Sequence, residues 1–425
     1  MNQAAHQTTE PLPSTNGRAT PARNAIILIG DGMGAAHRFA GQLLLAGRYG
    51  LLTMDRLPVV GQMATLSADP ASFVTDSAAA ATAISTGVKT VNGAVSIDPA
   101  GRPRTTLLEL AKRAGKAVGL VTTCQVTDAT PAAFGAHVNH RSDQSEVARQ
   151  YLHGSGVDVV LGGGAAWWLP AGTPDPFGSG DPLLRGRGTA GDLIAAAARL
   201  GYRPVADADG LAAAVNDPRS ERVLGLFAAQ EMFEQAAEGD GGSYAPTVTL
   251  AEMTGAAIEI LSRNPEGFFL MVEESAIDRM AHRNNAPLTL KGVLELDLAV
   301  QVALAYAERD PETLVVVTAD HETGGLAVAG SADTPYPYEP GGGFLDTLLA
   351  GEDGPFPVVD EPFGFVVGWA TTGHTAATVP LTAAGPGADA LAGFYENTHV
   401  FEVVAESLGL LSHHLPERRT GRATG

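Results

Sequence analysis

The apolar residues of this chain fall into short runs that are separated by segments with a helical period. Seven runs, rich in Val, Ile, Leu and Phe, have the length of strands. They are residues 25–30, 117–123, 157–163, 222–227, 267–273, 313–320 and 363–369. Runs that are apolar throughout, rather than alternating, are typical of strands buried on both faces. The pattern therefore predicts a mostly parallel sheet.

Segments of helical period lie between these runs, as expected where helices connect parallel strands. They are residues 78–86, 106–114, 143–152, 190–200, 249–262, 288–308 and 398–409. Residues 165–190 and 331–362 are rich in Gly, Pro and Asp and are predicted to be surface insertions. The chain shows no internal repeat. We therefore expect one α/β domain, with a mostly parallel central sheet and helices on both faces.

Composition narrows the range of partners. The chain has 425 residues, 45% of them hydrophobic, which suffices for one large α/β domain. Its formal net charge of −20 argues against a nucleic-acid partner, because phosphate backbones select basic surfaces. An anionic substrate would need a local positive site, such as metal ions. No apolar run is long enough to suggest a membrane span.

The start of the chain is polar and rich in Pro and Thr, without the apolar stretch of a secretory signal. We expect a flexible arm there, in a protein that is either cytoplasmic or has lost its signal. The single cysteine, Cys124, excludes an internal disulfide and is expected to be buried in a strand.

The stretch VTDSAAAATAISTG, residues 74–87, places an acid and a serine before a run of small residues. Alanine forms helices well and fills little core volume, so this helix is expected to come close to the sheet. Asp76 or Ser77 can cap its start, and Gly87 suits its end. The same position suits a nucleophilic serine, because free N–H groups and the helix dipole favour an alkoxide or a phosphate. From this segment alone, a capped structural helix and a nucleophile both remain open.

Three strand candidates end in side chains that can bind metals. Asp31, Glu273 and the pair Asp320–His321 each end or follow an apolar run. One Asp after a strand is most often a turn residue or a helix cap, but three such strands are hard to explain by capping alone. Ligands of open α/β sheets bind at the carboxyl ends of the strands.

Further candidate ligands lie outside these strand ends. Asp278 and His282, at i and i+4, would share a helix face, although this spacing is common and, taken alone, a solvated face is the more frequent explanation for it. His374 lies in a loop rich in Gly and Thr. The full set of candidate ligands is Asp31, Glu273, Asp278, His282, Asp320, His321 and His374. This set exceeds what one tetrahedral zinc needs and indicates two or three metals.

Such a set suits the hydrolysis of a phosphate ester, which needs a nucleophile, neutralisation of the equatorial oxygens and stabilisation of the leaving group. Two metals about 4 Å apart can supply this. One would activate Ser77 and the other would bind the leaving oxygen. An arginine fork would hold two further phosphate oxygens.

Six ordered motifs of the chain resemble those of the alkaline phosphatase family. They are IILIGDGMG, VTDSAAAATAISTGVKTVNGAVS, VTDATPAAFGAHVNHR, MVEESAIDRMAH, VVVTADHETGGL and TTGHTAATVPL. The resemblance covers residues 24–411 as one catalytic domain and leaves 1–23 as a flexible arm and 412–425 as a flexible tail. Residues 331–362 are short for the family's crown insertion, so reduced dimer contacts are expected.

The resemblance implies hydrolysis of small phosphate monoesters to alcohol and inorganic phosphate. It also implies a periplasmic or secreted location and a homodimer. The implied cofactors are two Zn²⁺ and one Mg²⁺ per chain. The first zinc would be held by Asp278, His282 and His374, and the second, next to Ser77, by Asp31, Asp320 and His321. Asp31 would bridge to a magnesium completed by Thr130 and Glu273.

By the same resemblance, Ser77 is the nucleophile that becomes phosphoserine. Arg141 would grip the phosphate, oriented by Asp76, and Asp128 would lie near the magnesium site. His137 and His140 are expected to be structural or to lie behind the ligands. Trp167 and Trp168 are expected to pack in a loop, with a contact to substrate at the rim of the site as the alternative.

The position after Asp278 departs from the family pattern. Relatives carry Lys, His or Trp there, and this chain has Arg279. The third metal could therefore be magnesium or a further zinc. We expect Arg279 to pair with Asp128 through two parallel hydrogen bonds and to add positive charge behind Arg141. The alternative is a solvated helix residue.

Other activities remain to be weighed. A phosphodiesterase or phosphomutase of the same superfamily is the main alternative. A sulfatase is disfavoured because alanines follow Ser77 instead of a C/S-x-P-x-R context, and a serine esterase because no G-x-S-x-G elbow occurs. A phosphate-binding protein without turnover would not need Ser77 together with Arg141 and every ligand.

Overall fold

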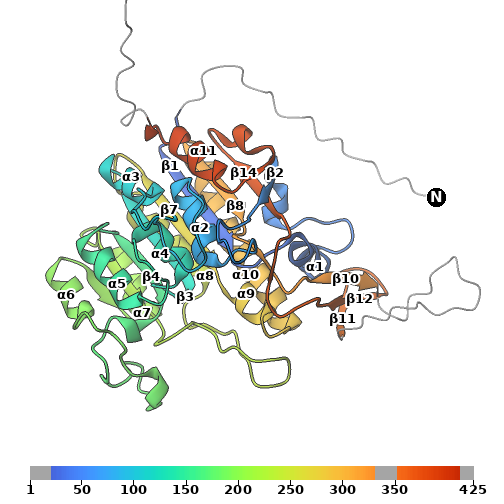
Figure 1. Ribbon diagram of the computed structural model, residues 1–425, viewed down its shortest axis with the longest axis horizontal. Helices are drawn as coiled ribbons and strands as arrows, with labels where there is room; N and C mark the ends of the chain where they lie inside the picture. The colour runs from blue at the N-terminus through green and yellow to red at the C-terminus, as the bar shows by residue number, and fades with distance from the viewer. Residues whose placement is uncertain (1–20, 331–351, 412–425) are drawn as a thin grey trace, which may run out of the picture.

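The computed structural model describes residues 21–330 and 352–411. Most of the expected N-terminal arm, the whole expected C-terminal tail and residues 331–351 of the expected crown-like insertion lie outside these ranges. Figure 1 shows a central sheet with helices on both sides and a small separate sheet, β10–β12, at one edge of the molecule.

The central sheet has ten strands among the described residues. In order across the sheet they are β15 (Gly393–Glu396), β2 (Val59–Ala64), β14 (Val379–Ala384), β8 (Thr313–Thr318), β1 (Asn24–Gly30), β7 (Phe268–Glu274), β3 (Ala117–Gln125), β4 (Val159–Gly163), β6 (Val223–Leu226) and β5 (Arg203–Val205). All neighbours pair in parallel except around β14, which runs against β8 and β2. The central strands β1, β7, β3 and β8 are buried throughout. Apolar and polar residues do not alternate along these strands because helices cover both faces of the sheet.

The helices are α1 (Ala35–Ala46), α2 (Ser77–Thr86), α3 (Leu107–Arg113), α4 (Ala129–Gly135), α5 (Gln144–His153), α6 (Leu193–Arg199), α7 (Ala208–Asn216), α8 (Leu250–Leu261), α9 (Ala276–Ala281), α10 (Ala286–Arg309) and α11 (His399–Ser407). Two neighbouring residues of β3 show which helices cover which face of the central sheet. Gly119 faces Leu261 of α8, and the side chain of Leu120 faces Gly135 of α4. Successive residues of a strand point to opposite faces, so α8 and α4 cover opposite sides of the sheet.

The predicted fold class is confirmed: the sheet is mostly parallel and has helices on both faces. Six of the seven predicted strands lie in it. The seventh, at 363–369, forms β12 (Gly364–Gly368), which instead pairs antiparallel with β10 (Ala327–Gly330) and β11 (Glu352–Pro357). Its Phe365 and Val367 pack in a second apolar cluster with Leu43 of α1 and Leu290 of α10. A buried run does not by itself show which sheet it joins.

Several elements were not predicted. They are the strands β2, β5, β10, β11, β14 and β15, the helices α1, α4, α7 and α9, and the two-residue pair β9 (Glu322–Thr323) and β13 (His374–Thr375). Strand β2 alternates between buried and more exposed residues, and β15 has no fully buried residue, so neither forms the continuous apolar run that marks the central strands. Helices α4 and α9 are only seven and six residues long.

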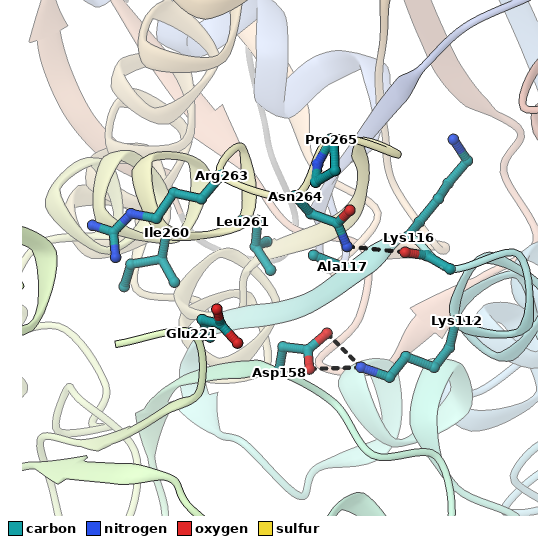
Figure 2. A pocket seen from close by; sticks show the side chains of 11 residues that line it. Lys112, Lys116, Ala117, Asp158, Glu221, Ile260, Leu261, Arg263, Asn264 and Pro265 are labelled. Atoms are coloured by element: carbon teal, nitrogen blue, oxygen red, sulfur yellow. Dashed lines mark hydrogen bonds and ion pairs between the residues drawn. The ribbon is translucent and has the colours of Figure 1, made fainter. Parts of the chain in front are cut away.

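The amino ends of β3, β4 and β7 surround a cavity of about 420 Å³ at the sheet edge away from the predicted site. Figure 2 shows Lys112 facing both carboxylate oxygens of Asp158, at 2.6 and 2.7 Å. Asp158 also accepts the backbone N–H of Val118 at 3.0 Å. Lys116 donates to the carbonyl oxygens of Arg23 and Glu266. The charges here tie α3 to the starts of β3 and β4.

We predict that Asp158→Asn lowers the free energy of unfolding by about 1–3 kcal/mol, because it leaves the Lys112 ammonium without its carboxylate. Denaturation followed by tryptophan fluorescence, with zinc and magnesium present, measures this. Turnover of the folded variant should equal that of the wild type, because the ion pair lies at the opposite edge of the sheet. Glu221→Gln, at an exposed residue of the same cavity, is the matched control. Equal stability of the two variants would show that the ion pair is not stabilising.

Candidate metal and phosphate site

The candidate ligands converge at the carboxyl ends of three adjacent strands. Asp31 follows β1, Glu273 lies near the end of β7, and Asp320 and His321 follow β8. The helix α9 begins directly after β7 and carries Asp278, and its C-cap is His282. His374 opens the two-residue strand β13, which pairs with β9 directly after His321. Residues that are far apart in the sequence, from Asp31 to His374, therefore lie together at the carboxyl ends of these strands.

Asp278, His282 and His374 form the first group. The Nε2 atoms of the two histidines are 3.1 Å apart, and they lie 3.3 and 3.5 Å from Asp278 Oδ1. Ligands at about 2.0–2.2 Å from a tetrahedral zinc lie roughly 3.3 Å from one another. The spacing of these three atoms therefore fits one zinc ion.

Backbone carbonyls orient the two histidines of this group. His282 Nδ1 lies 2.6 Å from the carbonyl oxygen of Thr372, and His374 Nδ1 lies 2.8 Å from that of Thr75. A carbonyl can only accept, so Nδ1 must carry the proton in both rings. The lone pairs of Nε2 then point toward Asp278, which is the orientation that metal-binding histidines need.

Asp31, Asp320 and His321 form the second group, and all three are buried. His321 Nε2 is 3.2 Å from Asp320 Oδ2 and 3.5 Å from Asp31 Oδ1. Neither carboxylate oxygen has a hydrogen-bond donor among the described residues. Buried carboxylate oxygens without donors are costly, and a cation held between them and the imidazole satisfies them.

A third set of oxygen atoms lies behind the second group. Thr130 Oγ1 and Glu273 Oε1 are buried and have no hydrogen-bond partner among the described residues. The other Glu273 oxygen accepts from Thr122 Oγ1 at 2.5 Å. Ser275 Oγ lies 3.5 Å from Asp31 Oδ2. The unpartnered atoms are all oxygens, the donor type that magnesium prefers.

The electrostatics of the site show an excess of buried negative charge. Burial raises the pKa of Asp31 well above its usual range, and the charge of Asp320 raises it further. Burial also raises the pKa of Glu273 to about 8 and that of Asp320 to about 6. Burial also opposes the ionisation of Asp278, but when His282 and His374 are protonated their hydrogen bonds take the pKa of Asp278 well below the usual range. The protein by itself cannot hold all these carboxylates ionised, and bound cations can.

Ser77 is the first residue of α2, and Asp76 is its N-cap. Ser77 Oγ lies 3.1 Å from His321 Nε2, so the hydroxyl touches the second group. Gly87 ends the helix in the left-handed conformation, as its position predicted. Every residue of α2 is buried, and the helix packs mainly against α4, α3 and α11. The small residues thus let other helices come close, whereas contact with the sheet edge is made by Ser77 at the helix start.

Gly32 lets the end of β1 lie close to Thr323 and to the backbone of α9. Gly32 has a positive φ of 72°, and a Cβ there would lie 2.7 Å from Thr323 Oγ1 and 3.0 Å from the Asp278 backbone. Its N–H donates to Asp320 Oδ1 at 3.1 Å. A side chain at position 32 would push Asp31 away from α9, which explains the first glycine of the DGMG motif.

Asp76 has two roles at once. Its Oδ1 accepts from the N–H of Ala79 at 2.9 Å, which caps α2, and its Oδ2 accepts from Gly93 N at 3.0 Å. The same Oδ2 lies 3.3 Å from Arg141 Nη1. One carboxylate therefore fixes both the helix that carries Ser77 and the guanidinium beside it.

The expected Arg279–Asp128 pair is present, at 2.7 Å between Arg279 Nη2 and Asp128 Oδ2. It has one hydrogen bond instead of the two expected parallel ones, because Arg141 Nη2 also contacts both oxygens of Asp128 at 3.3 Å. Arg279 Nη2 further lies 4.0 Å from Cys124 Sγ. Burial opposes the ionisation of Asp128, but Arg279 and then Arg141 lower its pKa to about 2. Arg279 is thus part of the site wall and not a solvated helix residue.

These groups border one open cavity of about 340 Å³. Its lining comprises Ser77, Gln125, Asp128, Arg141, Ser142, Gln144, Glu231, Asp278, Arg279, His282 and His374. Four of them, Gln125, Ser142, Gln144 and Glu231, were not predicted from the sequence. They belong to no motif and come from three separate segments, so no local signal marked them.

Of the five residues that were not predicted to hold metal or phosphate, all but His140 are buried or partly buried. His137 contacts the carbonyl oxygen of Ser96 at 2.8 Å and Glu109 Oε1 at 3.0 Å, and His140 is exposed. Cys124 is fully buried in β3, and Trp168 is buried as well. Trp167 is partly buried and donates its indole N–H to Gln125 Oε1 at 2.5 Å. Trp167 therefore supports a residue of the cavity wall.

The family model described as alkaline phosphatase matches residues 22–338. The chain belongs to the alkaline phosphatase family. Streptomycin-6-phosphate phosphatase of Streptomyces griseus is 38% identical, over 92% of this chain and 91% of that protein. Alkaline phosphatase H of Pseudomonas aeruginosa is 36% identical, over 92% of this chain and 86% of that protein. Membership makes the chain a phosphatase that hydrolyses phosphate monoesters with the aid of metals.

Solved alkaline phosphatase structures share the fold. A variant of the alkaline phosphatase from the Antarctic bacterium TAB5, with magnesium bound in its M3 site, superposes with a TM-score of 0.72. It is 28% identical and covers 92% of this chain and 99% of its own. In the described ranges of this alkaline phosphatase, no helix combines the length and the apolar character needed to cross a membrane.

Proposed function

We propose that this phosphatase transfers the phosphoryl group of a monoester to Ser77 and then to water, at a site with two Zn²⁺ and one Mg²⁺ per chain. One observation carries the proposal. The Ser77 hydroxyl lies 3.1 Å from His321 Nε2, at the point where a buried set of Asp and His ligands converges. A hydroxyl in that position and at a helix start is placed for attack on phosphorus.

The proposed ligand assignment follows the three groups of the site. Asp278, His282 and His374 would hold the first zinc. Asp31, Asp320 and His321 would hold the second, and Asp31 with Thr130 and Glu273 the magnesium. The oxygen-only third set supports magnesium over a further zinc. When bound, these ions would neutralise phosphate oxygens and stabilise the attacking and leaving oxygens.

The residues of the chain supply the covalent step and the positioning. Ser77 Oγ loses its proton and forms the bond to phosphorus as the bond from phosphorus to the alcohol oxygen breaks, and the alcohol takes up a proton. Water then loses a proton as it attacks the phosphoserine, the Oγ–phosphorus bond breaks, Ser77 Oγ takes up a proton, and inorganic phosphate leaves. Arg141, held by Asp76 and Asp128, would donate two N–H groups to the phosphate. Asp76 and Asp128 thereby hold the guanidinium in place before the substrate arrives.

A phosphodiesterase or phosphomutase would use much of the same site. Hydrolysis of a nitrophenyl phosphate monoester, compared with a diester of the same nitrophenol, distinguishes these activities. Family membership also supports the homodimer and the periplasmic or secreted location as proposals. Light scattering on the purified protein measures the mass in solution and tests the dimer.

Ser77→Ala is expected to keep the fold and to lower kcat by about 10³-fold or more, because no other hydroxyl replaces the nucleophile. Acid quenching during turnover should trap a phosphoenzyme on the wild type and none on the variant. Ser72→Ala, in the loop before α2, is the control and should retain activity. A kcat of the Ser77 variant within a few fold of wild type would refute the nucleophile assignment.

Chelation is expected to abolish activity, and Zn²⁺ together with Mg²⁺ to restore it. His374→Ala should lower the zinc content by about one ion per chain, since His374 would be one of only three protein ligands of its zinc. Elemental analysis after gel filtration gives the stoichiometry. His399→Ala, at a partly exposed histidine on α11, should bind the full complement. An unchanged zinc content in the His374 variant would contradict the assignment.

Arg279→Ala is expected to raise KM and to weaken inhibition by inorganic phosphate by about tenfold, because the lost charge binds the dianion in substrate and product alike. Its kcat should hold, or rise if phosphate release limits turnover. Steady-state kinetics at fixed pH and salt measure both constants. Arg283→Ala, at an exposed residue just after α9, is the control. A phosphate inhibition constant equal to that of wild type would remove Arg279 from phosphate binding.

A further inference from the structure

The cavity above Ser77 has an outer wall that takes no part in holding metal or phosphate. Gln125, Ser142, Gln144 and Glu231 line the cavity together with the nucleophile and Arg141. A volume of about 340 Å³ admits a phosphate with a small organic group attached. Since the phosphate is held at Ser77 and Arg141, the alcohol part of a monoester lies within reach of this wall.

Glu231 brings the only formal charge to that wall. Three carboxylates line the cavity. Asp128 is paired with two arginines and Asp278 with two histidines. Glu231 has no ion-pair partner in the part of the chain that the structure describes, and its side chain is only half-buried. Its charge is therefore available to a bound molecule.

The backbone on both sides of Glu231 is fixed. The carbonyl oxygen of Gln230 accepts from Gly164 N at 2.8 Å, and the N–H of Met232 donates to the carbonyl oxygen of Thr123 at 2.9 Å. A Cβ on the neighbouring Gly163 would lie 2.1 Å from the Gln230 oxygen. These contacts hold the segment after β6 against the ends of β3 and β4, so Glu231 has a defined place in the wall.

A chain of hydrogen bonds orients the side chain. Trp167 Nε1 donates to Gln125 Oε1 at 2.5 Å, which turns the amide nitrogen of Gln125 outward. That nitrogen donates to Glu231 Oε1 at 3.0 Å. Oε1 is thereby anchored, and Oε2 is left to accept from a ligand.

We propose that Glu231 determines specificity by favouring phosphate monoesters whose alcohol carries an ammonium or guanidinium group. The inference rests on the proposed phosphomonoesterase site. Arg141 and Arg279 bind the phosphate group of the substrate. The Glu231 carboxylate on the outer wall attracts a cationic group in the alcohol part of the ester. It repels an alcohol part that is itself anionic, and a neutral one gains nothing from it.

Two substrates of equal shape test the charge alone. Phosphocholine carries a trimethylammonium group, and 3,3-dimethylbutyl phosphate carries a neutral tert-butyl group in its place. The quantity measured is the ratio of their kcat/KM values, in wild type and in Glu231→Gln. Differences in leaving-group chemistry cancel when the ratio of one enzyme is divided by that of the other. Gln at position 231 still accepts the hydrogen bond from Gln125.

We expect the cationic preference to fall about two- to fivefold in Glu231→Gln at low salt, the range for a partly exposed charge pair. It should fall further in Glu231→Lys, and the difference from wild type should shrink in high salt because the interaction is screened. The matched control is Glu234→Gln, an exposed residue of the same segment that does not line the cavity, and its ratio should equal that of wild type.

An unchanged ratio in both Glu231 variants would overturn the inference and leave the proposed function intact. Failure of the wild type to hydrolyse the neutral ester, in the presence of both metals, would instead contradict the proposed function. A ratio that changes in the Glu234 variant as much as in Glu231→Gln would also overturn the inference. The effect would then come from the overall electrostatic potential of the protein and not from the position of Glu231.

Discussion

The crowding of buried carboxylates at one sheet edge is the constraint on which the rest of this structure depends. Asp31, Glu273, Asp278 and Asp320 are all buried within one small region. Without cations, repulsion and the loss of water would keep some of them protonated, as the raised pKa values of Asp31, Glu273 and Asp320 show. The fold therefore presents a cation-binding site at high electrostatic cost, and the cost is offset when metal binds. In the proposed mechanism, metal affinity and the reactivity of Ser77 therefore have the same origin.

Helix α2 and the loops around it place the proposed nucleophile and phosphate-binding groups beside these carboxylates. Its small residues permit close packing against neighbouring helices, so the start of the helix reaches the ligands while its body is fully buried. Asp76 caps the helix and also holds Arg141, and Asp128 joins Arg141 to Arg279. Ser77 and the two arginines are thus fixed relative to each other. In the proposed mechanism this is the pre-organisation that phosphoryl transfer requires.

The sequence allowed the central strands and the candidate ligands at their ends to be predicted because both have local signals. Continuous apolar runs marked β1, β7 and β8, and the acidic residues and histidines at their ends followed from the rule for parallel sheets. The edge strand β15 and its neighbour β2 lack such runs and were missed. Residues 363–369 join the small sheet instead of the central one because they pack against α1 and α10, and no local sequence pattern shows such contacts. The same holds for the outer wall of the cavity, where Gln125 and Glu231 meet across 106 positions of the chain.

Anomalous diffraction on both sides of the zinc absorption edge, from crystals of protein purified without chelator, tests the central claim most directly. The account predicts two zinc peaks per chain, one among Asp278, His282 and His374 and the other among Asp31, Asp320 and His321. It predicts a lighter ion, without zinc signal, beside Thr130 and Glu273. Zinc signal at neither of the first two positions, in a protein that hydrolyses phosphate monoesters, would contradict the account.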